Sequence, residues 1–243
     1  MSPDRTLAIA VRIVNQIVRD RRSLAMIIVA PVVVMSLVGF SFADQRDVLD
    51  RLAPALMGVF AMFFVFILTG VSFLRERAQG TLERLLTTPV GRADLLVGYL
   101  LGFLLFASIQ SLVILLYTTL ALQIDYQGAL WQIFVLLMVL TVVAVNLGIF
   151  ISTFARNEFQ VVQFIPLVLA PQIFLSGVIL PVEQLPGYFQ AVSKVLPLTY
   201  AVDGLKEIML NGQSLGDIGV DLGVLIGFAA VLLVLAAATV RRT

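Results

Sequence analysis

The chain has 243 residues, of which 60% are hydrophobic and 13% charged, with a formal net charge of only +1 and a mean hydropathy of +1.04. Because a soluble domain is usually about 45–50% apolar and about 25% charged, this composition predicts an integral membrane protein. The chain has no cysteine and no histidine, which excludes disulfides, thiol chemistry and His-ligated haem, and removes the commonest metal ligand.

The N-terminal residues predict an amphipathic helix. The Ser-Pro-Asp sequence at residues 2–4 is typical of a helix start. Apolar residues then recur at helical spacing from Leu7 to Val18, while arginine and amide side chains occupy the other side. We expect residues 1–22 to form a helix in the membrane interface, with packing on protein as the alternative.

Long apolar runs follow, each with the length needed to cross the ~30 Å hydrocarbon core. The first is too long for a cleaved signal peptide, so we expect a retained helix. The predicted spans are residues 23–42, 52–74, 95–122, 130–154, 161–180 and 218–240.

Most connections between these spans are short, but residues 181–217 form a longer segment that predicts two helices, over residues 185–196 and 199–210. Pro197 separates them, Thr199 is the expected cap of the second, and Asn211-Gly212 is the expected end. Such helices would lie in the interface or dip partly into the bilayer.

Glycines at a spacing of four residues occur in two spans. Gly98 and Gly102 lie in the third, and Gly219, Gly223 and Gly227 lie in the sixth. This spacing predicts close approach of another helix, and both faces would serve a dimer of identical or of related chains.

The positive charges predict the orientation. With six spans and a cytoplasmic N-terminus, only Arg46, Arg51, Lys194 and Lys206 of the 16 Lys and Arg residues fall outside. The positive-inside rule therefore places both termini in the cytoplasm, in a multi-pass protein of the inner (plasma) membrane.

The polar stretch from Arg75 to Arg92, RERAQGTLERLLTTPVGR, lies between the second and third spans. Gly80 interrupts it and Pro89 stops it. Leu82, Leu85 and Leu86 lie between them at the i, i+3, i+4 spacing of one helix face. The stretch is either a docking surface for another subunit or an ordinary basic loop.

The sequence shows no energy source of its own. No charged residue lies at the centre of a span, which argues against a proton-coupled pump. The phosphate-binding pattern G-x-x-x-x-G-K-[ST] is absent, and the two lysines, Lys194 and Lys206, do not follow glycine. If the chain pumps, another subunit must supply the energy.

Two segments carry a family resemblance. Residues 75–102, RERAQGTLERLLTTPVGRADLLVGYLLG, resemble the cytoplasmic loop of ABC-2 type permeases, the membrane subunits of one class of ATP-binding cassette exporters. Residues 176–212, with a P-x-E-x-L-P start and a P-L-T-Y-A core, resemble the family's segment before the last span. Together the two matches cover about a quarter of the chain.

The resemblance implies roles for particular residues. The helix around residues 80–86 would be a coupling helix that docks into the ATPase, and Arg156 and Glu158 would make a smaller second contact. The residues that match the family's coupling pattern are Glu76, Gly80, Thr81, Leu82, Glu83, Leu85, Leu86 and Pro89.

The segment before the last span would form an external lid over the translocation path. Pro197 and Tyr200 would shape it, or would simply pack the external helices. The implied lid residues are Pro181, Glu183, Pro186, Pro197, Thr199 and Tyr200.

In this family the second and fifth spans are expected to line a central cavity. Aromatic residues on these spans would make that cavity hydrophobic, although the simpler explanation, which we prefer, is that they face lipid or pack between helices. The candidates are Phe60, Phe63, Phe64, Phe164 and Phe174.

We therefore expect an all-α integral membrane fold, a single ABC-2 type transmembrane domain over residues 1–243. It would have six spans, an N-terminal interface helix, a cytoplasmic coupling helix between spans two and three, and an external re-entrant helix pair between spans five and six. The chain would bind no metal or cofactor and would not be an enzyme, because ATP and Mg would sit on the partner.

The expected partners are two copies of an ATP-binding cassette ATPase, a second permease chain in a homodimer or heterodimer, and membrane lipid, but no nucleic acid. The expected substrate is amphipathic, a drug or a lipid-like molecule. The alternatives are a polysaccharide-exporting permease of the same family, or an ATPase-independent channel or assembly factor.

Overall fold

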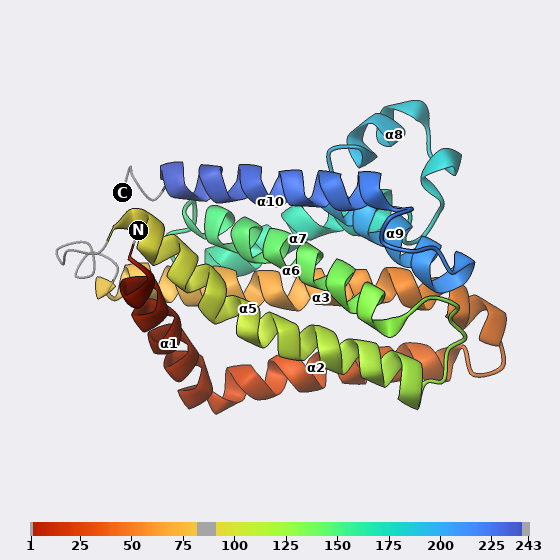
Figure 1. Ribbon diagram of the computed structural model, residues 1–243, viewed down its shortest axis with the longest axis horizontal. Coiled ribbons are helices and arrows are strands. Elements are labelled where there is room, and N and C mark those ends of the chain that lie inside the picture. The colour runs from red at the N-terminus through yellow and green to blue at the C-terminus, as the bar shows by residue number, and fades with distance from the viewer. Residues whose placement is uncertain (1, 82–90, 240–243) are drawn as a thin grey trace.

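The computed structural model describes residues 2–81 and 91–239, and within these ranges the chain forms helices and their connections, as predicted (Figure 1). The long helices run side by side along the long axis of the molecule. Their bounds are α1 Pro3–Arg19, α2 Arg21–Ser41, α3 Arg46–Ala78, α5 Arg92–Leu116, the π-helical turn η1 Tyr117–Ala121, α6 Leu130–Ser152, α7 Glu158–Leu175, the 3-10 turn η2 Val182–Gln184, α8 Gly187–Ser193, α9 Pro197–Asn211 and α10 Gly219–Thr239.

Five of the described helices are long and apolar enough to cross a membrane, judged by length and composition. They are α3, α5 with η1, α6, α7 and α10. Helix α2 runs alongside α3 and α5, but its apolar part, Ile27–Ser41, is shorter than these five. The expected six-span layout is therefore supported for five spans.

Several helix ends differ from the predicted ends of the spans. Helix α3 begins at Arg46. Most of residues 43–51, the polar segment expected to connect the first two spans, therefore forms the first turns of α3. Helix α7 ends at Leu175, five residues before the predicted end at Leu180, and Gly177 shortly after it has a positive φ of 74°.

The second helix predicted within residues 181–217 also begins differently from the prediction. Pro197 is the first residue of α9 and Leu196 occupies the cap position, so Thr199 is not the cap. The hydroxyl of Thr199 instead donates to the carbonyl oxygen of Ser193 at 2.8 Å. The predicted end is confirmed, because Gly212 terminates α9 in the left-handed conformation.

Helix α1 crosses one end of the bundle obliquely (Figure 1) and packs on the start of α5. Ile9 and Ile13 on its inner face are 4% and 2% exposed. A Cβ atom added at Gly98 would lie 2.7 Å from the Cβ of Ile9, and one at Gly102 would lie 2.8 Å from that of Ile13. The close approach predicted from these two glycines is therefore made by α1 of the same chain.

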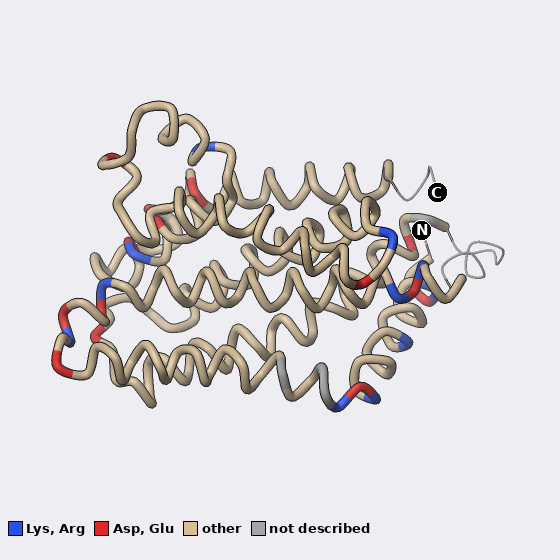
Figure 2. The backbone as a smooth tube through the Cα atoms, turned by 180° about the vertical axis from the view of Figure 1, so that it is seen from behind, with Lys and Arg blue, Asp and Glu red and all other residues tan. Residues whose placement is uncertain are grey.

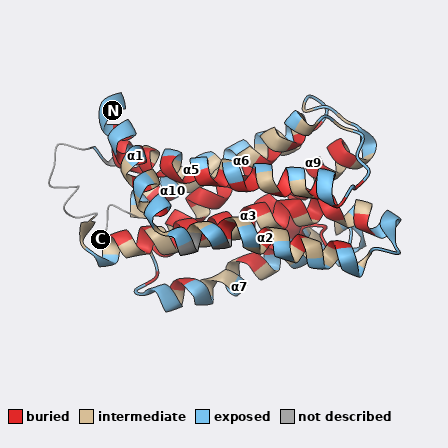
Figure 3. Cartoon of the chain, turned by 90° about the horizontal axis from the view of Figure 1, so that it is seen from below, coloured by how far each residue is buried: buried red, intermediate tan, exposed pale blue. Residues whose placement is uncertain are grey.

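The core lies between α3 and α6, while α7 and α10 are mostly exposed. The helices differ in how far their most apolar 18 residues are buried. In α3 67% of them are buried, whereas in α7 17% and in α10 11% are buried. Figure 3 shows the exposed outer surface of α7. No other part of the described chain lies within 4 Å of a Cβ added at Gly219, Gly223 or Gly227, so the glycine face of α10 is open.

Charged residues gather at the two ends of the bundle and are absent from the middle of its described part (Figure 2). Buried polar groups in the middle donate between helices. Gln110 of α5 donates to the carbonyl of Phe60 in α3 at 3.0 Å, and Asn146 of α6 donates to that of Ala229 in α10 at 3.1 Å. These bonds help to hold neighbouring spans together where hydrophobic association is weak.

The packing of α1 on α5 predicts that Gly98→Ala lowers the thermal stability of the protein in detergent. The added methyl group would meet the Ile9 side chain at 2.7 Å and the Thr6 carbonyl oxygen at 2.9 Å. Such overpacking costs about 1–3 kcal/mol. Gly223→Ala is the matched control. Both substitutions raise helix propensity by about 1 kcal/mol, but only the methyl group added at Gly98 meets atoms of another helix. Equal melting temperatures for the two variants would contradict this packing.

Candidate functional site

The candidate site lies at the end of the bundle where α1 crosses the end of α3. A cleft of about 400 Å³ opens there between the two helices. Its lining is mostly polar and includes Arg12, Gln16 and Asp20 from the α1 side and Arg75, Glu76, Gln79 and Thr81 from the α3 side. Three consecutive residues in the last turns of α3, namely Arg75, Glu76 and Arg77, form what we call the α3 cluster.

Glu76 is the buried member of the α3 cluster, with 3% of its surface exposed. Its Oε2 atom accepts hydrogen bonds from the guanidinium of Arg12 in α1 and, at 3.0 Å, from the hydroxyl of Tyr99 in α5. A buried carboxylate is tolerated when it is paired and hydrogen-bonded in this way. Glu76 therefore joins α1, α3 and α5.

Arg12 remains charged in this arrangement. Burial lowers the pKa of its guanidinium, but the hydrogen bond to Glu76 and the neighbouring negative charge outweigh that effect and raise the pKa above its usual value. The guanidinium of Arg12 therefore stays positively charged beside the Glu76 carboxylate.

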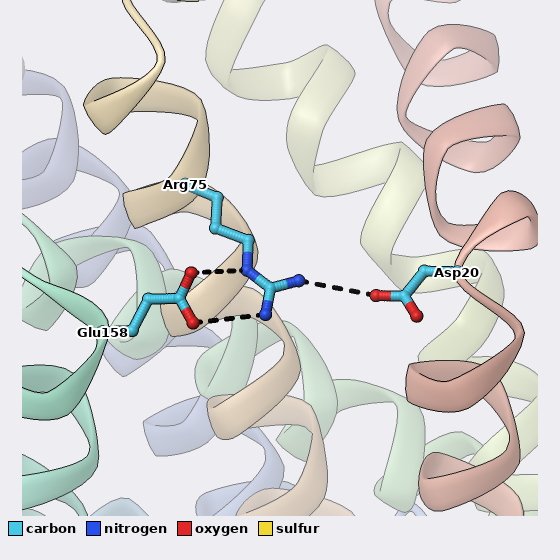
Figure 4. A network of polar contacts seen from close by, with 3 residues as sticks. All are labelled: Asp20, Arg75 and Glu158. Carbon is cyan, nitrogen blue, oxygen red and sulfur yellow. Dashed lines mark hydrogen bonds and ion pairs between the residues drawn. The ribbon is translucent and has the colours of Figure 1, made fainter.

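Arg75 bridges two further elements (Figure 4). Its Nε and Nη2 atoms donate to both carboxylate oxygens of Glu158 at the start of α7, at 2.7 and 3.2 Å. Its Nη1 atom lies 3.4 Å from Oδ2 of Asp20 at the junction of α1 and α2. The paired hydrogen bonds to Glu158 fix the orientation of the Arg75 guanidinium as well as its distance.

Arg77 reaches the end of α6, where its Nη1 atom donates to the carbonyl oxygen of Ser152 at 3.1 Å. After it, Gly80 has a positive φ of 66°, and the hydroxyl of Thr81 donates to the carbonyl oxygen of Glu76 at 2.9 Å. The α3 cluster thus contacts α1, α5, α6 and α7 within a single turn that leads directly into residues 82–90.

The structure brings part of the predicted coupling set together. Glu76, Gly80, Thr81, Arg156 and Glu158 all lie at this end. Arg156 is exposed, and its backbone N–H donates to the side-chain oxygen of Gln160. Glu76 faces α1 and α5 rather than solvent. Five other predicted coupling residues lie outside the described residues, namely Leu82, Glu83, Leu85, Leu86 and Pro89.

Sequence reasoning missed three partners of the α3 cluster: Arg12, Tyr99 and Asp20. Arg12 was recognisable only as part of the polar side of an amphipathic helix. Tyr99 lies in a predicted span, and the spacing of apolar residues there does not indicate that its hydroxyl bonds to a charged side chain.

The predicted lid lies at the opposite end of the bundle, around α8 and α9 (Figure 1). Its first three predicted residues, Pro181, Glu183 and Pro186, are exposed. Pro197 and Thr199 are buried, because α9 packs between α3, α6 and α10. The hydroxyl of Tyr200 donates to the carbonyl oxygen of Lys194 at 2.8 Å. These contacts are those of a packed helix, and a gating role stays a prediction.

The lid end also holds a pair of charged side chains, Asp203 and Lys206, that was not predicted. Lys206 of α9 donates from Nζ to the carbonyl oxygen of Gly177, just beyond α7. Burial raises the pKa of Asp203 to about 6, although the nearby positive charge of Lys206 opposes the shift. Asp203 and Lys206 lie three residues apart in the sequence, about one helical turn. This spacing could have been used to predict that the two charges lie close together.

The predicted cavity residues do not form one group in the described structure. Phe60, Phe63 and Phe64 are half-buried neighbours on α3, with the rings of Phe63 and Phe64 5.1 Å apart. Phe164 packs on the small apolar cluster between α3 and α7, whereas Phe174 is 61% exposed. Their placement along a cavity stays a prediction.

Comparison with known proteins decides the family. A model of the ABC-2 type transporter family matches residues 5–210. The chain belongs to the ABC-2 type transporter family. This ABC-2 chain is similar to the linearmycin resistance permease protein LnrN of Bacillus subtilis, at 30% identity over 191 residues, 78% of this chain and 48% of the relative.

Two further relatives are similar over most of this ABC-2 chain. The probable multidrug ABC transporter permease YbhR of Escherichia coli is 30% identical over 162 residues, covering 67% of this chain and 44% of YbhR. Nodulation protein J of Rhizobium meliloti is 32% identical over 171 residues, covering 70% of this chain and 64% of the relative. The chain spans less than two thirds of the length of each of these three relatives.

The contrast between the two charge pairs predicts unequal effects of mutation. Glu76→Ala leaves the buried Tyr99 hydroxyl and the Arg12 guanidinium without their acceptor, which costs about 1–3 kcal/mol of stability. Glu158→Ala removes an exposed partner of Arg75, and such pairs contribute about 0–1 kcal/mol. Thermal denaturation in detergent should therefore show a clearly lower melting temperature for Glu76→Ala only. A larger loss for Glu158→Ala would contradict the assignment of Glu76 as the structural pair.

Proposed function

We propose that this ABC-2 chain is the permease subunit of an ATP-driven exporter. It forms the translocation path for an amphipathic, drug-like or lipid-like substrate and couples to a separate ATPase subunit. The observation that carries the proposal is the position of the α3 cluster. It contacts α1, α5, α6 and α7 in the turn directly before residues 82–90, the stretch that resembles the family's coupling helix.

In this mechanism the chain supplies positioning and movement. ATP and Mg are held by the partner, since the sequence lacks a phosphate-binding loop. Closure of two ATPase copies displaces the segment after α3, and the α3 cluster passes that displacement to four other helices. Charge-assisted hydrogen bonds suit this task because they fix orientation as well as distance.

The exposed helices support an assembly of two permease chains. Helix α7 packs on α3 along one side and leaves most of its apolar surface uncovered. A second chain, identical or related, would cover part of this surface and would enclose the path between α3 and α7. The names of the relatives LnrN and YbhR, a resistance permease and a probable multidrug permease, support an amphipathic substrate.

The proposed arrangement places the two ends of the bundle on opposite sides of the membrane. Gln79 follows α3 and Gln190 lies in α8, at opposite ends of the molecule (Figure 1). The chain has no native cysteine, so Gln79→Cys and Gln190→Cys each create a single label site. We expect a membrane-impermeant maleimide to label Gln190→Cys in intact cells and Gln79→Cys only after permeabilisation. Labelling of both from one side would contradict the arrangement.

The coupling proposal predicts that Leu85→Glu weakens binding of the ATPase. Removing a docked leucine costs about 1.5–3 kcal/mol, and burying an unpaired carboxylate adds to this. Because about 1.4 kcal/mol is tenfold in affinity, co-purification should fall at least tenfold. Arg84→Gln, off the leucine stripe, is the control, since an exposed charge contributes about 0–1 kcal/mol. Unchanged co-purification and export by Leu85→Glu would overturn the proposal.

A further inference from the structure

Helix α1 has three distinct faces, and the first is the one that packs on α5. Ile9, Ile13 and Ile17 recur at helical spacing along this face, and each is at most 4% exposed. This face is therefore fully occupied by the chain itself.

The second face is an uncovered apolar stripe. Leu7, Val11 and Val18 are 62%, 50% and 51% exposed. Their spacings of four and seven residues place them in one line on the helix. A neighbouring exposed stripe continues along the outer side of α2, where Val29 and Leu37 are 53% and 61% exposed. Both stripes are left uncovered by the described residues of the chain.

The third face is positively charged. Arg12 on this face pairs with Glu76. Arg19 at the end of α1 and Arg21 at the start of α2 are exposed, and neither forms an ion pair with another described residue. The nearby carboxylate of Asp20 faces Arg75. Two cations therefore lie beside the apolar stripe without an acidic partner from the described part of the chain.

The position of α1 in the bundle matches a membrane surface. The helix crosses the end of the bundle obliquely (Figure 1), where the apolar middle gives way to charged residues (Figure 2). A helix at this level has protein on one side, acyl chains on a second and lipid headgroups on a third. The three faces of α1 correspond to these three surroundings.

We propose that α1 is a binding surface for anionic phospholipid. The stripe of Leu7, Val11 and Val18 lies against the acyl chains, and Arg19 and Arg21 bind the headgroup phosphates. The acyl chains of a zwitterionic lipid can cover the apolar stripe, but only a lipid with net negative charge neutralises the positive charges of the two arginines. Through the Arg12–Glu76 pair, the bound lipid is also connected to the α3 cluster. The proposal requires the membrane location of the family and does not depend on an ATPase.

The test uses tryptophan quenching in vesicles. Trp131 is the one tryptophan of the chain, so Trp131→Phe gives a silent background. Val11→Trp then reports from the stripe, with Leu7→Trp as a second reporter if the first fails to fold. Gln16→Trp is the control, because Gln16 lines the polar cleft between α1 and α3. The reconstituted protein is titrated with brominated phosphatidylglycerol or brominated phosphatidylcholine in otherwise unbrominated vesicles.

We expect both brominated lipids to quench the stripe reporter more strongly than the cleft reporter, and phosphatidylglycerol to do so at lower mole fraction. Arg19→Gln and Arg21→Gln should each reduce this preference by about fivefold at low salt. Arg51→Gln, at the opposite end, should leave it unchanged. Absence of quenching at the stripe, or equal quenching by the two lipids, would overturn the proposal.

Discussion

The buried carboxylate of Glu76 is the constraint on which the rest of this end of the molecule depends. A charge in that position is stable only while Arg12 and Tyr99 remain beside it. Keeping Arg12 there requires α1 to lie across the bundle and against α5, and that close approach requires glycine at positions 98 and 102. A charge pair, a helix orientation and two glycines thus form one interdependent arrangement.

The two ends of the bundle are built differently, and the difference suits a transporter. At one end, the α3 cluster joins several helix termini through charged side chains, some of them exposed. At the other, α9 is buried between three helices, and hydroxyl groups link α7, α8 and α9. Between them the described part of the bundle carries no charged residues (Figure 2), so under the proposed function movement at the first end would reach the second through packed helices rather than through titrating groups.

Much of the fold could be predicted from the sequence, because apolar runs, proline and glycine act locally. Amphipathicity identified α1, and Gly212 identified the end of α9. The start of α3 was missed because its first turns are polar, and polar residues at a helix end resemble a connection. The candidate site could be predicted only in part. Glu76 was found through its motif, but its burial depends on Arg12 and Tyr99, which are distant in sequence and which local patterns do not join to it.

The coupling energy between Arg12 and Glu76 tests the account most directly. A double-mutant cycle with Arg12→Ala, Glu76→Ala and the double variant isolates this energy from the other effects of each change. Thermal stability of the purified protein in detergent is the measurement. The account predicts a favourable coupling of at least about 1 kcal/mol, larger than that of a parallel cycle on the exposed pair Arg75 and Glu158. Additive effects of Arg12→Ala and Glu76→Ala would contradict it, because the two side chains would then not hold α1 to α3.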